Sequence, residues 1–320
     1  MPSANLRIVD PSRADARAPR APRTGLLAPG RIDALTHSPW IARVAWGALP
    51  LLTGPALGEA LADASRPVQL VASVGAWALW LGVLIATLVP TTVSLTALRV
   101  AAPGASIAAF AALVDAGASS TTILGLAAAL AAALAALAPE TAEAFVDGSS
   151  YGDERRLPLK VPIALLAGPT ELAWLAEVAG VCAGPLLLAA RQWVAGAVVL
   201  AIGLPAARWG VRVLHVLSRR WLVFVPTGVV VHDQLTLVDP ILLRRGVLRS
   251  VGPAPADSDA FDLTGGASGL ALELRLNEPV SVLPVARRRT PAELEEVTAV
   301  LVTPSRPGRA TDEARRRRLG

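Results

Sequence analysis

The residues with the clearest potential for chemistry are two carboxylates in an apolar stretch. Glu171 and Glu177 lie within PTELAWLAEVAGVCAG, and an ionisable side chain inside a membrane is costly enough to be a functional candidate. Glu171 comes early in this segment, where a helix N-terminus favours a carboxylate. Glu177 lies roughly 9 Å deeper at 1.5 Å per residue. It is a candidate proton or cation site, paired with Arg99; the alternatives are a structural pair and a carboxyl kept neutral by burial.

Other nucleophiles and metal ligands are sparse. Those that we considered are His37, His215, His232, Cys182, Ser149 and Ser150. The histidines are far apart and have no metal-ligand partner at helical spacing. The single cysteine can form neither a disulfide nor a cysteine-based metal site within one chain, and we expect it to be a small buried hydrophobe. The serines lack the context of a nucleophile elbow.

A charged loop and several arginines are candidates for docking. The loop carries Tyr151, Asp153, Glu154, Arg155 and Arg156, and the later basic residues are Arg219, Arg220, Arg244, Arg245 and Arg249. One hypothesis is that Asp153 and Glu154 dock onto Arg244 and Arg245; the alternative is a solvated linker. A second hypothesis is that Arg219 and Arg220, with Arg244 and Arg245, contact anionic lipid headgroups, at about 1 kcal/mol for each charge.

The composition indicates a membrane protein. Of the 320 residues, 53% are hydrophobic and only 17% are charged, against about 25% charged in soluble domains; the mean hydropathy is +0.51. The sequence pI is about 10.7, but the basic residues flank apolar segments and fill the tails. This distribution is typical of charges that orient membrane helices, so we expect no nucleic-acid partner.

The first part of the chain predicts a tail and four spans. Residues 1–38 are rich in Pro, Ala and Arg and predict a disordered basic tail that sets topology; an RNA or headgroup role is the alternative. Residues 39–139 predict transmembrane helices 1–4, because each needs about 20 apolar residues. Pro50 and Pro55 should kink the first helix. The segments within 91–138 are weaker, and either both cross or neither does; we favour both.

The middle of the chain predicts two further spans and an orientation. Residues 140–161 form a polar cytoplasmic connector with turn-forming glycines, and 162–218 supply transmembrane helices 5 and 6. With six spans, both termini lie on one side. Of the 30 basic residues, only Arg66 and Arg191 then face outward. The positive-inside rule therefore predicts an inner-membrane protein with both termini in the cytoplasm.

The pattern changes to that of a β domain over residues 219–303. WLVFV and GVVV flank Pro226-Thr227, which predicts two strands and a turn. Leucines alternate over 270–276, and 280–285 predicts another strand. A helix should begin at Thr290, with Pro291 in its first turn, and end before Pro304. Residues 304–320 read as a disordered basic tail.

Four strings carry a family resemblance. They are GSSYGDERRLPL, GPLLLAARQW, RRWLVFVPTGVVVHDQLTLVDP and GPAPADSDAFDLTGG. They resemble a family of actinobacterial multi-pass membrane proteins, over roughly residues 40–290, and this resemblance implies no activity. Separately, many strands followed by one C-terminal helix resemble the small bacterial pleckstrin-homology-like (PH-like) domains that follow membrane helices.

We therefore expect a membrane all-α bundle of about six helices, followed by a small cytoplasmic PH-like β domain with one C-terminal helix. We expect no enzymatic activity, no cofactor and no metal. The expected work is anchoring, scaffolding or sensing through the β domain, with the lipid bilayer and a membrane or cytoplasmic protein as partners. The alternative is a small proton- or cation-coupled transporter that uses the Glu177 region. The scarcity of polar residues in the spans favours binding.

Overall fold

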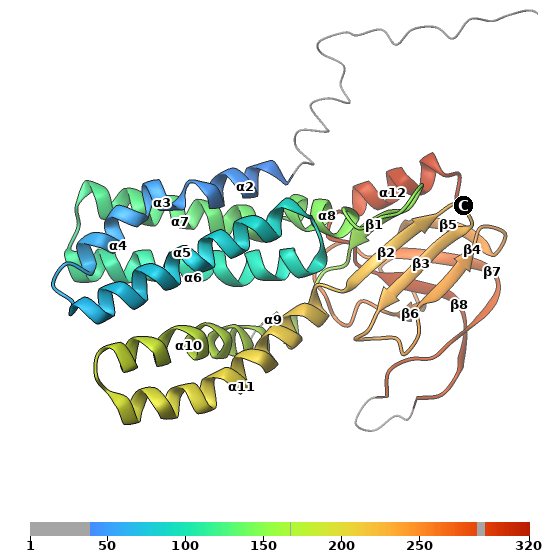
Figure 1. The fold of residues 1–320 in the computed structure, drawn as a ribbon. Coiled ribbons are helices and arrows are strands. Elements are labelled where there is room, and N and C mark those ends of the chain that lie inside the picture. The colour runs from blue at the N-terminus through green and yellow to red at the C-terminus, as the bar shows by residue number, and fades with distance from the viewer. Residues whose placement is uncertain (1–38, 167, 287–291) are drawn as a thin grey trace, which may run out of the picture.

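Long helices lead into a strand-rich region at one end of the molecule (Figure 1). The computed structural model describes residues 39–166, 168–286 and 292–320; the predicted N-terminal tail and the predicted cap at Thr290 and Pro291 lie outside these residues. Within them, five helices are long and apolar enough to cross a membrane, which indicates a membrane-embedded protein. These helices are α5 (Arg66–Leu88), α6 (Thr92–Ala116), α7 (Ser120–Leu137), α10 (Pro169–Ala189) and α11 (Trp193–Leu217).

The first predicted span is divided into three short helices. They are α2 (Trp40–Gly47), α3 (Leu49–Leu52) and α4 (Gly54–Ala60). Pro50 and Pro55 stand in the first turns of α3 and α4, where proline is tolerated because no intrahelical donor is required. The breaks therefore fall where the prolines predict them, and five of the six predicted spans are long helices.

The two weakly predicted segments form the full-length helices α6 and α7. Capping boxes begin both helices: the side chain of Thr91 accepts from the backbone of Ser94, and that of Ser119 accepts from the backbone of Thr122. Small residues allow close packing, because a Cβ added to Gly125 would lie 3.0 Å from the Cβ of Ala56 in α4. One face of the alanine run, with Ala129, Ala132 and Ala136, is thus a buried packing surface.

Helices α10 and α11 form a tightly packed hairpin (Figure 1). Three glycines recur at every seventh residue of α11: Gly196, Gly203 and Gly210. At the centre, a Cβ on Gly203 would lie only 2.6 Å from the Cα of Gly180 in α10. A seven-residue repeat keeps one stripe of a helix against its partner, and small residues in that stripe let two membrane helices approach closely.

The strands form two four-stranded sheets. The first has the order β1 (Arg155–Pro158), β2 (Arg220–Val225), β3 (Gly228–Asp233) and β4 (Ile241–Arg244), all antiparallel. The second has the order β5 (Leu248–Pro253), β7 (Leu272–Val282), β8 (Glu295–Val302) and β6 (Phe261–Asp262), with β6 and β8 parallel. Leu222, Phe224, Leu274 and Val300 belong to the core that both sheets share. The predicted strands at 221–225 and 228–231 are confirmed. Of the strand predicted at 280–285, residues 280–282 continue β7, and Pro284 forms an isolated bridge with Leu237.

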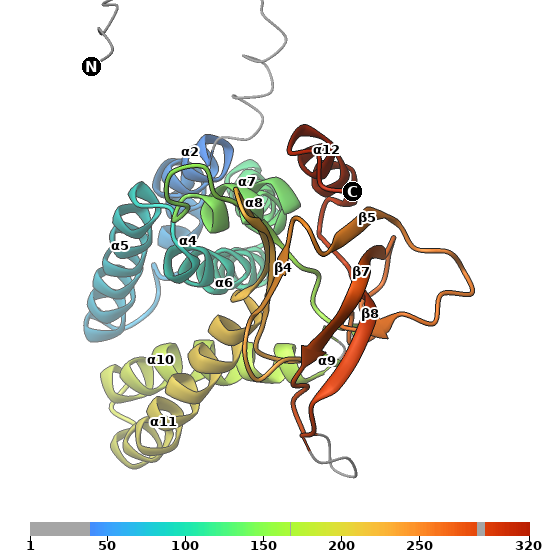
Figure 2. The ribbon, with the colours of Figure 1, turned by 90° about the vertical axis from the view of Figure 1, so that its right-hand side faces the viewer.

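The first sheet joins the helices in two ways. Its strands β1 and β2 are neighbours, yet α9 (Ile163–Leu166), α10 and α11 all lie between them in the chain. In addition, Trp221 and Val223 on its outer face belong to the same buried cluster as Phe145 and Val146 of α8 (Pro139–Asp147). Figure 1 shows α8 between the helical bundle and this sheet, and Figure 2, viewed from the strand end, shows α8 beside α7.

The C-terminal part differs from the predictions. The helix predicted to follow Thr290 is the strand β8, because valines at 297, 300 and 302 fill the core and β-branched residues fit a half-buried strand. The predicted disordered tail contains α12 (Pro307–Arg316). Ala310, Ala314 and Leu319 are buried against the strands, so this arginine-rich segment is anchored by small apolar residues.

Candidate functional site at the junction of helices and strands

A buried ion pair lies where α11 enters the first sheet. Arg220 Nε donates to Asp233 Oδ1 at 2.8 Å and Arg220 Nη2 donates to Asp233 Oδ2 at 2.6 Å. The two side chains are only 1% and 0% exposed. Arg220 Nη1 also donates to the carbonyl of Lys160 at 2.5 Å, ahead of α9. The prediction that Arg220 contacts lipid headgroups is therefore wrong, because its donors are used inside the protein. Arg219, the other predicted contact, is partly exposed, and its contact with lipid stays a prediction.

A second charged cluster ties the connector to the C-terminal segment. Arg155 binds Glu143 at 2.7 Å and Asp147 at 2.6 Å. The almost completely buried carboxylate of Glu143 also accepts from Arg306 at 3.2 Å, just before α12. The sequence reasoning missed Glu143 and Asp147, although their spacing of four residues places two carboxylates on one face of a helix.

The predicted docking of Asp153 and Glu154 onto Arg244 and Arg245 does not occur. Strand β1 follows these acidic residues directly and lies at the opposite edge of the first sheet from β4, which ends at Arg244. Glu154 instead pairs with Arg156 at 3.0 Å. The backbone carbonyl of Asp153 accepts from Arg317. Tyr151 is almost fully exposed. The connector thus joins the sheet as a strand rather than through a basic surface.

Three side chains stack on the outer face of the first sheet. The rings of Trp221 and His232 are cross-strand neighbours with centroids 4.7 Å apart. The Arg156 guanidinium carbon lies 5.9 Å from the Trp221 ring centroid. Burial, and then the positive charge of Arg219, lower the pKa of His232 below its ordinary value of 6.5. The buried Nδ1 atom of His232 has no partner among the described residues. The neutral imidazole is therefore the favoured form at this face.

The predicted intramembrane pair is not formed. Arg99 Nε donates to the carbonyl of Ala136 at 3.4 Å, near the C-terminal end of α7, and no ion pair joins Arg99 to Glu177 in the described residues. Glu177 Oε2 is buried without a hydrogen-bond partner there. Glu171 accepts from the backbone of Gly168 at 2.7 Å, which confirms its expected place at a helix N-terminus.

The remaining predicted residues lie apart from the junction clusters. Cys182 is exposed on α10, so the expectation that it is buried is wrong; the Gly180–Gly203 contact occupies the buried face of this helix. His215 Nδ1 lies 3.4 Å from the hydroxyl of Thr96, between α11 and α6.

Comparison with known proteins gives no further guide. No family model, no curated protein and no solved structure matches the chain. Within residues 39–166, 168–286 and 292–320, no group of three or more His, Cys, Asp or Glu side chains could hold a metal ion. The junction combines a buried ion pair with a strand contributed by the connector, and we take it as the candidate functional site.

Proposed function

We propose that this protein is a membrane-anchored binding protein, acting as a scaffold or a sensor through its strand-rich region. The observation that carries the proposal is the insertion of the α10–α11 hairpin between the paired strands β1 and β2. Both ends of one membrane hairpin thereby continue into neighbouring strands of a single sheet. A binding event on the sheet and a displacement of the hairpin are mechanically coupled in such an arrangement.

The proposed orientation places the strand-rich region and both termini in the cytoplasm at the inner membrane. The basic residues at the strand end of the helices support it: Arg43, Arg155, Arg156, Lys160, Arg208, Arg212 and Arg219. At the opposite end, Arg66 begins α5 and Arg191 lies between α10 and α11. This asymmetry agrees with the positive-inside rule. The kinked segment α2–α4 is proposed to be the sixth crossing.

Few polar contacts join the hairpin to the other helices. The indole of Trp174 in α10 donates to the carbonyl of Val100 in α6 at 2.9 Å. The hydroxyls of Thr96 and Ser218 lie 3.0 Å apart at the end of α11. Because few polar contacts among the described residues hold the hairpin to the other helices, the hairpin and the first sheet can respond together to a partner. This supports a sensing role as well as simple anchoring.

The proposed binding surface is the edge strand β4. Among the described strands, β4 has a neighbour on one side only, and an extended segment of another protein can add to such an edge. Leu242 is 42% exposed, Arg244 and Arg245 are exposed, and Arg244 makes no ion pair in the described residues. An acidic, extended segment of a membrane or cytoplasmic protein therefore fits the edge by charge.

The family resemblance belongs to the same proposal. We infer membership of the actinobacterial multi-pass membrane family from the four strings given above. Two sheets followed by the single helix α12 support a PH-like assignment, although β1 comes from the connector and β6 pairs with β8 in parallel. A PH-like domain would fit a binding role at the membrane surface.

The test uses the full chain in its native membranes, with a photo-crosslinking amino acid at Leu242. The matched control carries it at Leu270, a comparably exposed leucine just before β7 of the second sheet. We expect a discrete protein adduct from Leu242 only. Charge reversal of Arg244 and Arg245 should reduce the yield of this adduct roughly tenfold, because the reversed charges would repel an acidic partner. Equal adducts from both positions, or no effect of charge reversal, would contradict the proposal.

A second candidate function is a proton- or cation-coupled transporter. The observation that favours it is the buried Glu177 Oε2 atom without a partner in the described residues, because an ionisable group in a membrane span marks possible ion pathways. In proteoliposomes of the full chain, Glu177→Gln should then abolish a proton or cation flux. Absence of flux in the parent protein, or an unchanged flux in the variant, removes this candidate.

A further inference from the structure

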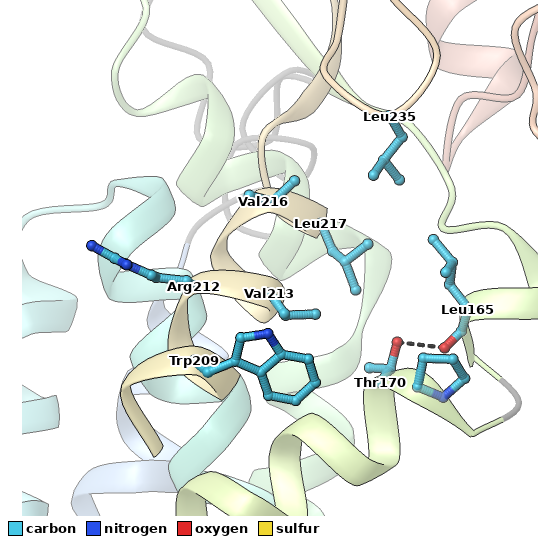
Figure 3. A pocket seen from close by; sticks show the side chains of 9 residues that line it. Leu165, Thr170, Trp209, Arg212, Val213, Val216, Leu217 and Leu235 are labelled. Atoms are coloured by element: carbon cyan, nitrogen blue, oxygen red, sulfur yellow. Dashed lines mark hydrogen bonds between the residues drawn. The ribbon is translucent and has the colours of Figure 1, made fainter. Parts of the chain in front are cut away.

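A pocket of about 340 Å³ lies between the start of α10, the end of α11 and the loop after β3. Figure 3 shows Trp209 and Val213 of α11 on one side, with Leu165 of α9 across the pocket and Leu235 of the loop above. Its size is at the lower end of the range for pockets that hold small ligands. The pocket is therefore lined by membrane helices and by the strand-rich region together.

The lining of the pocket is apolar and lacks acidic residues. The hydroxyl of Thr170 is occupied, because it donates to the carbonyl of Leu165 at 2.6 Å. Arg212 is the only charged residue of the lining, and its guanidinium extends away from the other lining side chains (Figure 3). An occupant thus needs an apolar body, with any negative charge at the rim.

The depth of the pocket matches the edge of the hydrocarbon layer. A helix needs about 20 residues to cross this layer, and about 20 residues from Trp193, where α11 begins, reach Val213. Helix α10 has 21 residues from Ala189 back to Pro169, so its start lies at the same depth. The pocket also continues into the bilayer-facing surface, because Trp209 is 55% exposed.

We propose that this pocket binds a phospholipid from the leaflet on the strand side. The glycerol-proximal part of one acyl chain fills the space between Val213 and Leu235. The phosphate lies at the rim, where the amphipathic ring of Trp209 suits the headgroup level. The bound lipid would bridge α11 and the loop after β3, a contact that ordinary lipids around the helices cannot make. The inference does not depend on the proposed protein-binding function.

The test uses the full chain in vesicles of phosphatidylcholine and phosphatidylglycerol. A small fraction of the phosphatidylglycerol carries a diazirine close to the ester of one acyl chain, and adducts are mapped by peptide mass spectrometry. We expect adducts on Leu235 as well as on exposed residues of α11. Val213→Trp should lower the Leu235 adducts at least roughly tenfold, because a filled, densely packed space excludes the chain.

Two further variants separate pocket binding from general lipid contact. Leu165→Trp fills the pocket from the opposite wall and should also remove the Leu235 adducts. Val198→Trp changes an exposed position on α11 and should leave them unchanged. Equal melting and elution of all variants establishes that they are folded. Absence of Leu235 adducts in the parent, or their persistence in both filled variants, overturns the proposal.

Discussion

Arg220 and Asp233 face each other across β2 and β3 with their side chains almost completely buried. Arg220 Nη1 donates to the carbonyl of Lys160, and Asp233 also accepts from the hydroxyl of Thr236 at 2.8 Å. One ion pair thus holds together the entry to the membrane hairpin, its exit and the end of β3. Because β1 and β2 flank the hairpin, this contact fixes both of its ends to the sheet.

Removing one partner of this pair should be severely destabilising. Arg220→Met leaves a buried, uncompensated carboxylate, which costs about 3–5 kcal/mol in comparable pairs. The expected result is a large fall in the thermal midpoint of the detergent-solubilised protein, followed by tryptophan fluorescence. Arg315→Met is the control, since the pair of Arg315 with Asp312 is exposed on α12 and should contribute little. An equal effect of both substitutions would contradict a special role for Arg220.

The hairpin should depend on glycine at its closest approach. Gly203→Leu places a side chain where even a Cβ would lie 2.6 Å from the Cα of Gly180, so α10 and α11 must separate. We expect a lower thermal midpoint and early aggregation in detergent, measured by size-exclusion chromatography after heating. Gly82→Leu in α5 is the matched control, because nothing lies within 4 Å of a Cβ added there. Equal tolerance of both changes would show that the hairpin does not need close packing.

The helices were largely predictable because the bilayer imposes a simple rule on sequence. A span needs a long apolar run, and α5, α10 and α11 each provide one. The breaks at Pro50 and Pro55 were predictable from the missing donor of proline. The heptad of Gly196, Gly203 and Gly210 was present in the sequence, but only the partner helix reveals which side of α11 is packed.

The strand-rich region was less predictable because its contacts join distant segments. Strand β1 has only four residues in a polar connector, and it becomes a strand because β2, some 60 residues later, presents an unpaired edge. The pairing of Arg220 with Asp233 depends on the register of β2 and β3. Helix α12 was not predicted, because its many arginines are typical of a disordered tail. Its alanines form a buried stripe only when the helix packs against the sheets.

Protection of the connector should depend on β1 and not on the basic edge. Leu157 is buried in the core of the strand-rich region, so Leu157→Asp should release β1 and make residues 150–160 sensitive to protease. The measurement uses sealed vesicles whose outer surface carries the strand-rich region, so that added protease reaches it. Charge reversal of Arg244 and Arg245 should leave the cleavage rate unchanged, because these residues lie at the opposite edge of the sheet. Faster cleavage after charge reversal would restore the docking hypothesis that the geometry argues against.

Stability should fall on acidification because of His232. Its pKa is lowered in the folded protein by burial and by the charge of Arg219, so the unfolded chain binds more protons once the pH falls below the ordinary pKa of 6.5, and protonation favours unfolding. The thermal midpoint should therefore decrease as the pH falls through about 6.5 towards the lowered pKa of the folded protein. His232→Phe keeps a ring against Trp221 but cannot be protonated, so it should reduce this decrease. If the variant retained the full pH dependence of the parent, another group would have to be responsible.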